Sequence, residues 1–160
     1  ITDATSKSTV AFSAGISDTH ANINSGGSQT ASMSKITTKD SDVVITVTNA
    51  VTASIGSSIT GYTTGNVHFT VGVSDSFSNL VSGTSVSQDM QNIDEHDSDV
   101  NITITDSPAT LNTADKVTGL NALMSGTTGD ITATISGSGS ILGNLQADTD
   151  TTQKLTITLK

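Results

Sequence analysis

Residues 8–23 are STVAFSAGISDTHANI, and residues 65–80 repeat them as GNVHFTVGVSDSFSNL. The match continues without a gap, so that residues 8–50 align on residues 65–107 at an offset of 57, and 18 of the 43 aligned pairs are identical. Agreement over this length indicates an internal repeat. Repeats of this size are typical of proteins that stack copies of one supersecondary unit.

A third, shorter copy follows. TTGNVHFTV at residues 63–71 recurs as TTGDITATI at 127–135, and LTITLK at 155–160 corresponds to the ITVTNA and ITITDS that end the aligned stretches. Terminal copies of stacked repeats are usually atypical in this way. The expected organisation is a single domain over residues 1–160, with repeats at 8–64, at 65–128 and, shortened, at 129–160.

Each copy predicts two strands, because apolar and polar residues alternate with the period of a pleated strand. Val43, Ile45 and Val47 are expected to point one way, while Thr46 and Thr48 point the other. The first strand of each copy is expected at 10–17, 67–74 and 131–136, and the second at 43–48, 100–105 and 155–159. The connections 24–42 and 81–99 predict irregular, Asp-rich loops.

The fold expected from this pattern is all-β. Two strands bury little alone, so the copies must pack on one another, either as coils of a β-solenoid, which gapless repetition favours, or as a β-sandwich. At most one short helix is expected, in NTADKVTGLNALMSG at 112–126, with Asn112 or Thr113 as its N-cap. Its apolar side consists of Val117, Leu120, Leu123 and Met124. The corresponding stretch 54–65 contains too many Gly and Ser for a firm helix.

The charge balance excludes several partners. The chain of 160 residues has 15 acidic and 6 basic residues, a formal net charge of -9, no Arg and no Cys. Nucleic acid is excluded because its recognition needs a basic footprint, and the lack of Cys excludes disulfides and thiolate zinc sites. No apolar run has the length of a membrane span, so membrane insertion is not expected. The chain begins with Ile1, which indicates a processed mature protein or an excised piece.

The two ends of the sequence are complementary. ITDATSK at 1–7 is similar to ITDSPAT at 104–110, the exit from a second strand, whereas the chain finishes on such a strand without an exit. Uncapped strand edges pair readily, and a head-to-tail contact that does not close gives a filament. The residues expected to mediate self-assembly are therefore Ile1, Thr2 and Asp3 of one copy and Leu155, Ile157 and Leu159 of the next.

The run ITITDSPATLNTADKVTGLNALMSGTTGDITATISGSGSILGNL, residues 102–145, resembles repeats of very large secreted or cell-surface proteins of marine cyanobacteria and other aquatic bacteria. In those repeats, Thr-rich ITVTD strands alternate with NALDALTTG-like helices and VTATIS strands. The resemblance covers the second half of the chain directly and the first half through the internal repeat. It implies an extracellular structural, adhesive or motility-related protein and supplies no catalytic residues.

Acidic residues gather in equivalent connections, because the repeat places Asp40 and Asp42 over Asp97 and Asp99. Carboxylates that lie close together repel one another unless a cation or a splayed geometry separates their charges, and calcium prefers such oxygen ligands. Two alternatives stay open, a solvated acidic surface and a calcium site. The candidate calcium ligands are Asp40, Asp42, Asp94, Asp97 and Asp99.

The function expected from these features is that of a secreted structural protein, outside the cell or on its surface, that self-assembles head to tail into a filament or surface layer. No enzyme activity is expected, because the GxSxG and GxxxxGK motifs are absent. One alternative is a module of a large calcium-dependent surface adhesin, whose target would be a surface glycan or a neighbouring cell. Another is an ice-binding β-solenoid with stacked Thr-x-Thr ladders. Those ladders would use Thr46, Thr48, Thr103, Thr105, Thr156 and Thr158.

Overall fold

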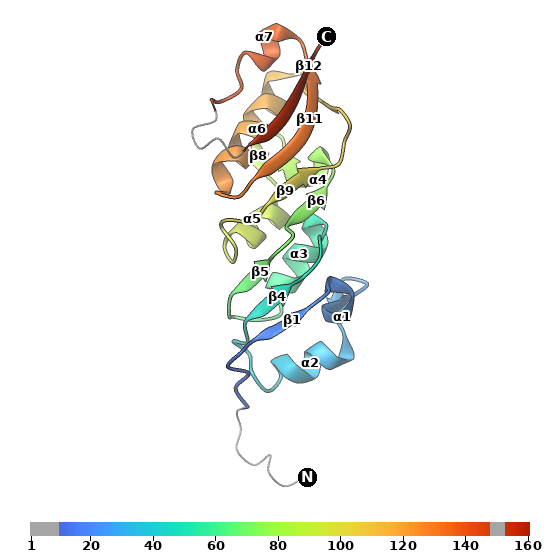
Figure 1. The fold of residues 1–160 in the computed structure, drawn as a ribbon, viewed down its shortest axis with the longest axis vertical. Helices are drawn as coiled ribbons and strands as arrows, with labels where there is room; N and C mark the ends of the chain where they lie inside the picture. The colour runs from blue at the N-terminus through green and yellow to red at the C-terminus, as the bar shows by residue number, and fades with distance from the viewer. Residues whose placement is uncertain (1–9, 148–152) are drawn as a thin grey trace.

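The strands follow one another along the long axis of an elongated molecule in the computed structural model, which describes residues 10–147 and 153–160 (Figure 1). The order along this axis is the order of the sequence, so β1 (Ile16–Asp18) lies near one end and β12 (Lys154–Leu159) near the other. The repeats predicted from the sequence are therefore stacked end on end.

The first repeat alternates strands with short helices. Its elements after β1 are α1 (His20–Ile23), β2 (Asn24–Ser25), β3 (Ser28–Gln29), α2 (Ala31–Thr37), β4 (Ile45–Val47) and α3 (Ala53–Thr60). The second repeat has the same order with two additional strands, β5 (Val67–Phe69) and β10 (Ala109–Thr110). Its other elements are β6 (Val73–Asp75), α4 (Phe77–Leu80), β7 (Val81–Ser82), β8 (Ser85–Val86), α5 (Gln88–Asp94), β9 (Ile102–Ile104) and α6 (Ala114–Gly126). The third consists of β11 (Ile131–Gly137), α7 (Gly139–Leu142) and β12.

The prediction of an all-β fold was wrong. The described residues form an α/β fold with seven helices, and both the β-solenoid and the β-sandwich are ruled out, because helices alternate with strands that pair in parallel. Antiparallel pairing occurs only in the small hairpins β2–β3 and β7–β8 of the described chain. Parallel neighbours need a crossover between them, and the short helices supply it.

The two Asp-rich connections, predicted to be irregular, each contain a hairpin and a helix. Thr30 accepts a hydrogen bond from the Met33 N–H at 3.2 Å to begin α2, and Ser87 accepts one from the Met90 N–H at 3.4 Å to begin α5. Met90 and Ile93 of α5 are both buried, three residues apart on one helix face. An N-cap residue and apolar residues three positions apart both indicate a helix. These helices are too short and too polar for the pattern to be recognised in the sequence.

The helix predicted at 112–126 is confirmed as α6, with Thr113 as its N-cap. The prediction for 54–65 was wrong, because α3 forms there in spite of its Gly and Ser residues. A side chain at Gly56 would place its first carbon 2.7 Å from a methyl group of Ile93. The glycine that lowers the intrinsic helix propensity of α3 thus lets this helix approach α5 closely.

The first strand of the second repeat is divided in two at Gly72, whose φ of 93° is a left-handed conformation that favours glycine. Its first half, β5, pairs with β4, and its second half, β6, pairs with β9. The sheet is consequently split into a three-stranded part, β1-β4-β5, and a five-stranded part that contains β6, β9, β10, β11 and β12. A bridge between Val51 and Val73 links the two parts.

One apolar cluster extends through the repeats. The strand residues that face it are Val and Ile at alternate positions, such as Ile45 and Val47 in β4 and Ile102 and Ile104 in β9. Helix residues such as Leu120 complete it. The alternation predicted for the second strands is therefore confirmed in β4 and β9, with one face buried and one face turned outward.

Candidate functional site

The strand β12 forms one edge of the five-stranded part of the sheet. Thr132 of β11 pairs with both Thr103 of β9 and Lys154 of β12, and β10 also pairs with β11. A residue within a sheet has two strand neighbours, so β9 and β12 lie on opposite sides of β11. Among the strands of residues 10–147 and 153–160, none pairs with the outer edge of β12.

Two large apolar side chains of this edge strand are exposed, Ile157 by 52% and Leu159 by 69%. Ile157 lies opposite Ile135, which is fully buried. Residues opposite each other in neighbouring strands share one face of the sheet, so the core face of the sheet continues onto β12. The predicted self-assembly residues Ile157 and Leu159 are thus exposed, while Leu155 is partly buried against the core.

Ile157 is the structural counterpart of Ile102. This corrects the sequence comparison, which matched LTITLK with ITITDS and so placed Leu155 opposite Ile102, two residues earlier. The N-caps of α4 and α7 are both serines whose hydroxyl lies 3.1 Å from that of the serine two residues on. Val73 and Ile135 each stand three residues before such a cap, and they pair with Ile102 and Ile157, respectively. The equivalent side chain is 1% exposed in β9 and 52% exposed in β12.

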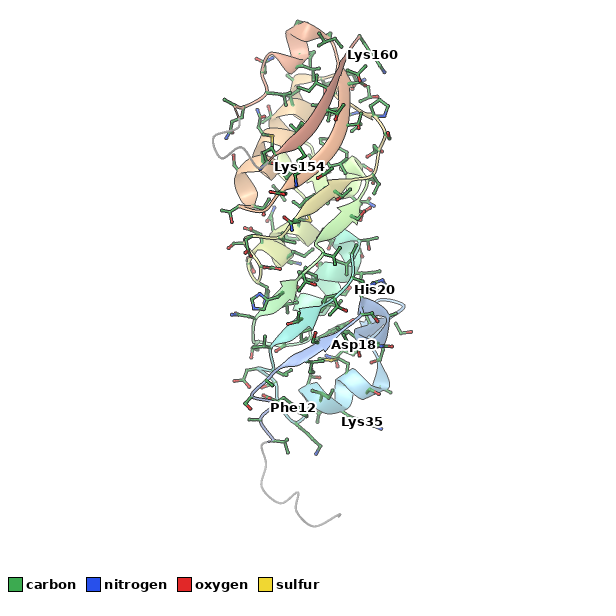
Figure 2. The ribbon with its side chains drawn as sticks, in the orientation of Figure 1. Phe12, Asp18, His20, Lys35, Lys154 and Lys160 are labelled. Atoms are coloured by element: carbon green, nitrogen blue, oxygen red, sulfur yellow. The ribbon has the colours of Figure 1, made fainter. Side chains whose placement is uncertain are left out.

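The opposite end of the molecule carries a matching unpaired segment at residues 10–12. These residues correspond to β5, where Val67 is fully buried because the strand pairs with β4. Val10, the counterpart of Val67, is 46% exposed, and no described strand pairs with it. The predicted strand 10–17 is therefore limited to β1. Figure 2 shows Phe12 near this end and Lys160 near the other. The predicted residues Ile1, Thr2 and Asp3 lie outside the described residues.

The first carboxylate of each predicted calcium pair accepts a hydrogen bond from a backbone amide. Asp40 accepts from Phe12 N–H, and Asp97 accepts from Phe69 N–H, each at 2.6 Å. The Phe12 amide lowers the pKa of Asp40 below its ordinary value. Burial raises the pKa of Asp97, which is only 7% exposed, although the Phe69 amide opposes this effect.

Asp40 lies beside Asp42 and Asp97 lies beside Asp99, and the two pairs line separate surface clefts. Asp94 is separate: it lines a cavity of about 60 Å³ that is mostly apolar, and its Oδ1 atom is buried without a hydrogen-bond partner. Burial raises the pKa of Asp94, and the charge of Glu95 adds to the effect. Within the described residues, no group of three or more acidic or histidine side chains is arranged to hold a metal ion.

Two further aspartates, Asp18 and Asp75, make the same hydrogen bonds in the first and second repeats. Asp18 Oδ1 accepts hydrogen bonds from Thr19 N–H and from the Asn22 side chain, both at 2.8 Å. Asp75 Oδ1 makes the same contacts in the second repeat, with Ser76 and Asn79. These acidic residues fix the turn into a short helix, which explains their recurrence without a bound ligand.

The predicted Thr-x-Thr ladders are not continuous. The second strands do not lie next to one another, because a first strand separates each pair. In register, Thr46 lies between Ser17 and His68. Thr103 lies between Ser74 and Thr132. The outward face is thus a mixed polar surface, which removes the stacked array on which the ice-binding alternative depended.

Comparisons with protein-family models, with curated proteins and with solved structures found no match in any of the three. In the part of the chain that the structure describes, no helix is long and apolar enough to cross a membrane.

Proposed function

We propose that this chain is an extracellular structural protein that associates head to tail, through β12 of one copy and the N-terminal part of the next, into a filament or surface layer. The observation that carries this proposal is the exposure of Ile157 and Leu159 on the core face of an edge strand. Edge strands with apolar side chains pair readily with other chains, and soluble proteins normally protect them.

The two ends differ, which gives the association a direction. At one end of the stack the unpaired edge belongs to β12, which is the second strand of its repeat. The other end begins with the unpaired residues 10–12 and with β1, which is the first strand of its repeat. A contact between unlike surfaces leaves the same two surfaces free on the enlarged particle. Such a heterologous contact continues from copy to copy unless it closes into a ring.

Association through this edge is expected to be weak and to depend on concentration. Full burial of an Ile or Leu side chain stabilises by about 1.5–3 kcal/mol, and association costs about 4–15 kcal/mol in lost freedom of motion. Because Ile157 and Leu159 are already partly buried, backbone pairing and the other side chains of the contact must supply much of the stabilisation. The extracellular setting is supported by the resemblance of residues 102–145 to repeats of secreted proteins, and the lack of Cys is compatible with it.

The experiment compares light scattering and electron microscopy of the wild type and Ile157→Asp at rising concentration. Regular polymers are expected for the wild type and single particles for the variant, because the new charge would be buried in the contact. Val71→Asp is the matched control, since Val71 is 55% exposed in the middle of the molecule. Removal of residues 1–7 is also expected to abolish assembly. Single particles of the wild type at every concentration, or unchanged polymers of Ile157→Asp, would overturn the proposal.

A further inference from the structure

The internal repeat specifies how the two ends meet. In both interfaces that the chain forms with itself, a second strand pairs with the first strand of the next repeat. β4 pairs with β5 through Ile45 and Val67, and β9 pairs with β11 through Ile102 and Ile131. β12 is the counterpart of β9, so the first strand of another repeat would pair with its unpaired edge.

Residues 10–12 are the unpaired counterpart of such a first strand. They align with β5, so Val10 corresponds to Val67 and Phe12 to Phe69. In β5 these positions are 0% and 3% exposed, whereas Val10 is 46% exposed. In a segment with the sequence of a buried strand, Val10 and Ala11 thus lie exposed at one end while Phe12 is partly buried. The edge that would pair with this segment lies exposed at the other end.

Resting on the proposed head-to-tail assembly, we infer that residues 10–12 of one copy extend the sheet of the next as a parallel strand on β12. The register follows from the internal interfaces: Ile157 lies opposite Val10, Thr158 opposite Ala11, and Leu159 opposite Phe12. The occupant of the β12 edge is therefore a second copy of this chain, and the junction continues the pairing between repeats.

The charges at the two ends are complementary in this register. Lys160 follows Leu159, so it comes next to the backbone of Phe12, whose N–H is bound by the Asp40 carboxylate. Asp40 and Asp42 also line a surface cleft of about 320 Å³ together with Val10 and Ala11. The cleft is also lined by Lys39, so its two carboxylates leave a net charge of -1. Lys160 of one copy therefore meets a weakly acidic cleft of the other, which favours this orientation over a contact between like ends.

The test is disulfide crosslinking, which is simple because the chain has no cysteine of its own. Adjacent strands lie about 4.8 Å apart, within the Cα separation that a disulfide spans. Under mild oxidation, the double variant Ala11→Cys with Thr158→Cys is expected to form a ladder of covalent oligomers on a non-reducing gel. A crosslink within one molecule is excluded, because Ala11 and Thr158 belong to opposite ends of the stack (Figure 1).

The control is Ala11→Cys with Thr156→Cys. Thr156 is also exposed on β12, on the same side of the strand as Thr158, but two residues out of register. Diagonal neighbours of this kind lie roughly 7–8 Å apart, so at least a fivefold lower yield of crosslinked chain is expected. A mixture of the two single variants Ala11→Cys and Thr158→Cys should give covalent dimers only, because each molecule then carries one reactive end.

The outcomes separate this inference from the proposed function. Polymers that crosslink equally in both double variants, in the control alone, or in neither, would overturn the register and leave head-to-tail assembly standing. Wild-type protein that stays monomeric in light scattering at every concentration would overturn the proposed function and, with it, the junction.

Discussion

The strands β9 and β12 have similar sequences, ITI at residues 102–104 and ITL at residues 157–159, and opposite environments. In β9, Ile102 and Ile104 are 1% and 4% exposed, because β6 and β11 flank the strand and helices cover its apolar face. In β12, the equivalent side chains of Ile157 and Leu159 are more than half exposed. Burial in this molecule is therefore set by the repeat that follows a strand and not by the strand itself.

The largest effect is expected for removal of an interior side chain. Ile102→Ala should lower the free energy of unfolding by about 2–5 kcal/mol, because it removes buried methylene groups and leaves a cavity. Ile157→Ala, measured in monomer at low concentration, should lower it by less than about 1 kcal/mol, since the side chain is already half in water. Urea denaturation provides both values. Equal losses would contradict the contrast between interior and edge.

The second largest loss of stability is expected for substitution of Gly72 and Gly15. Both glycines have a left-handed backbone conformation, and they hold equivalent positions in the second and first repeats. A side chain at Gly72 would collide with the backbone oxygen of Asn101, and one at Gly15 would lie 2.8 Å from that of Val44. The left-handed conformation alone costs a non-glycine residue about 1–3 kcal/mol. Both Ala variants should therefore be destabilised, Gly72→Ala more, because the interior backbone has less room. Thermal unfolding checks the order, and a milder loss for Gly72→Ala would contradict it.

The smallest change in stability is expected for substitution of Asp97 and Asp40, whose pKa values shift in opposite directions. Because the pKa of Asp97 is raised, the folded state binds a proton more readily than the unfolded state, and stability falls as pH rises through the window between the two pKa values. Because the pKa of Asp40 is lowered, its contribution is present above the unfolded pKa and is lost as pH falls through the folded value.

Asp97→Asn should therefore leave the melting temperature at pH 7 unchanged or raise it by no more than about 2–4 °C, since an amide oxygen can still accept the Phe69 N–H. Asp40→Asn should lower it slightly at pH 7 and have no effect near pH 3. Melting curves of both variants over pH 3–7 provide the measurement. A loss of stability for Asp97→Asn at pH 7 would show that the interior carboxylate stabilises the fold in its charged form.

The repeat, the positions of most strands and the helix α6 could be predicted from the sequence. Alternation of Val and Ile with Thr is a local pattern, and α6 has a Thr113 cap and thirteen residues over which a helical period is visible. The helices of four to eight residues were missed. Their stability comes from tertiary contacts, such as that of Gly56 with Ile93, because a helix of two turns is not stable by itself.

The candidate site was predicted in part. Ile157 and Leu159 were assigned to self-assembly from the similarity of the two ends, and the structure describes them as exposed. Residues 10–12 were missed because they were included in a regular strand, 10–17. Only the comparison with their buried counterparts in β5 shows that these residues lack a strand partner. The sequence comparison made Asp40 equivalent to Asp97, but their amide partners, Phe12 and Phe69, are 28 residues away along the chain and had no local signal.

Residue identity and short periods are enough to show which face of each strand is apolar, which stretches repeat and that the surface is acidic. Parallel pairing across helices, the division of the sheet at Gly72, and the burial of Ile102 in β9 against the exposure of Ile157 in β12 were visible only in the folded molecule. Burial and pairing depend on neighbours in space, and β12 has residues like those of β9 but no described strand on its outer edge.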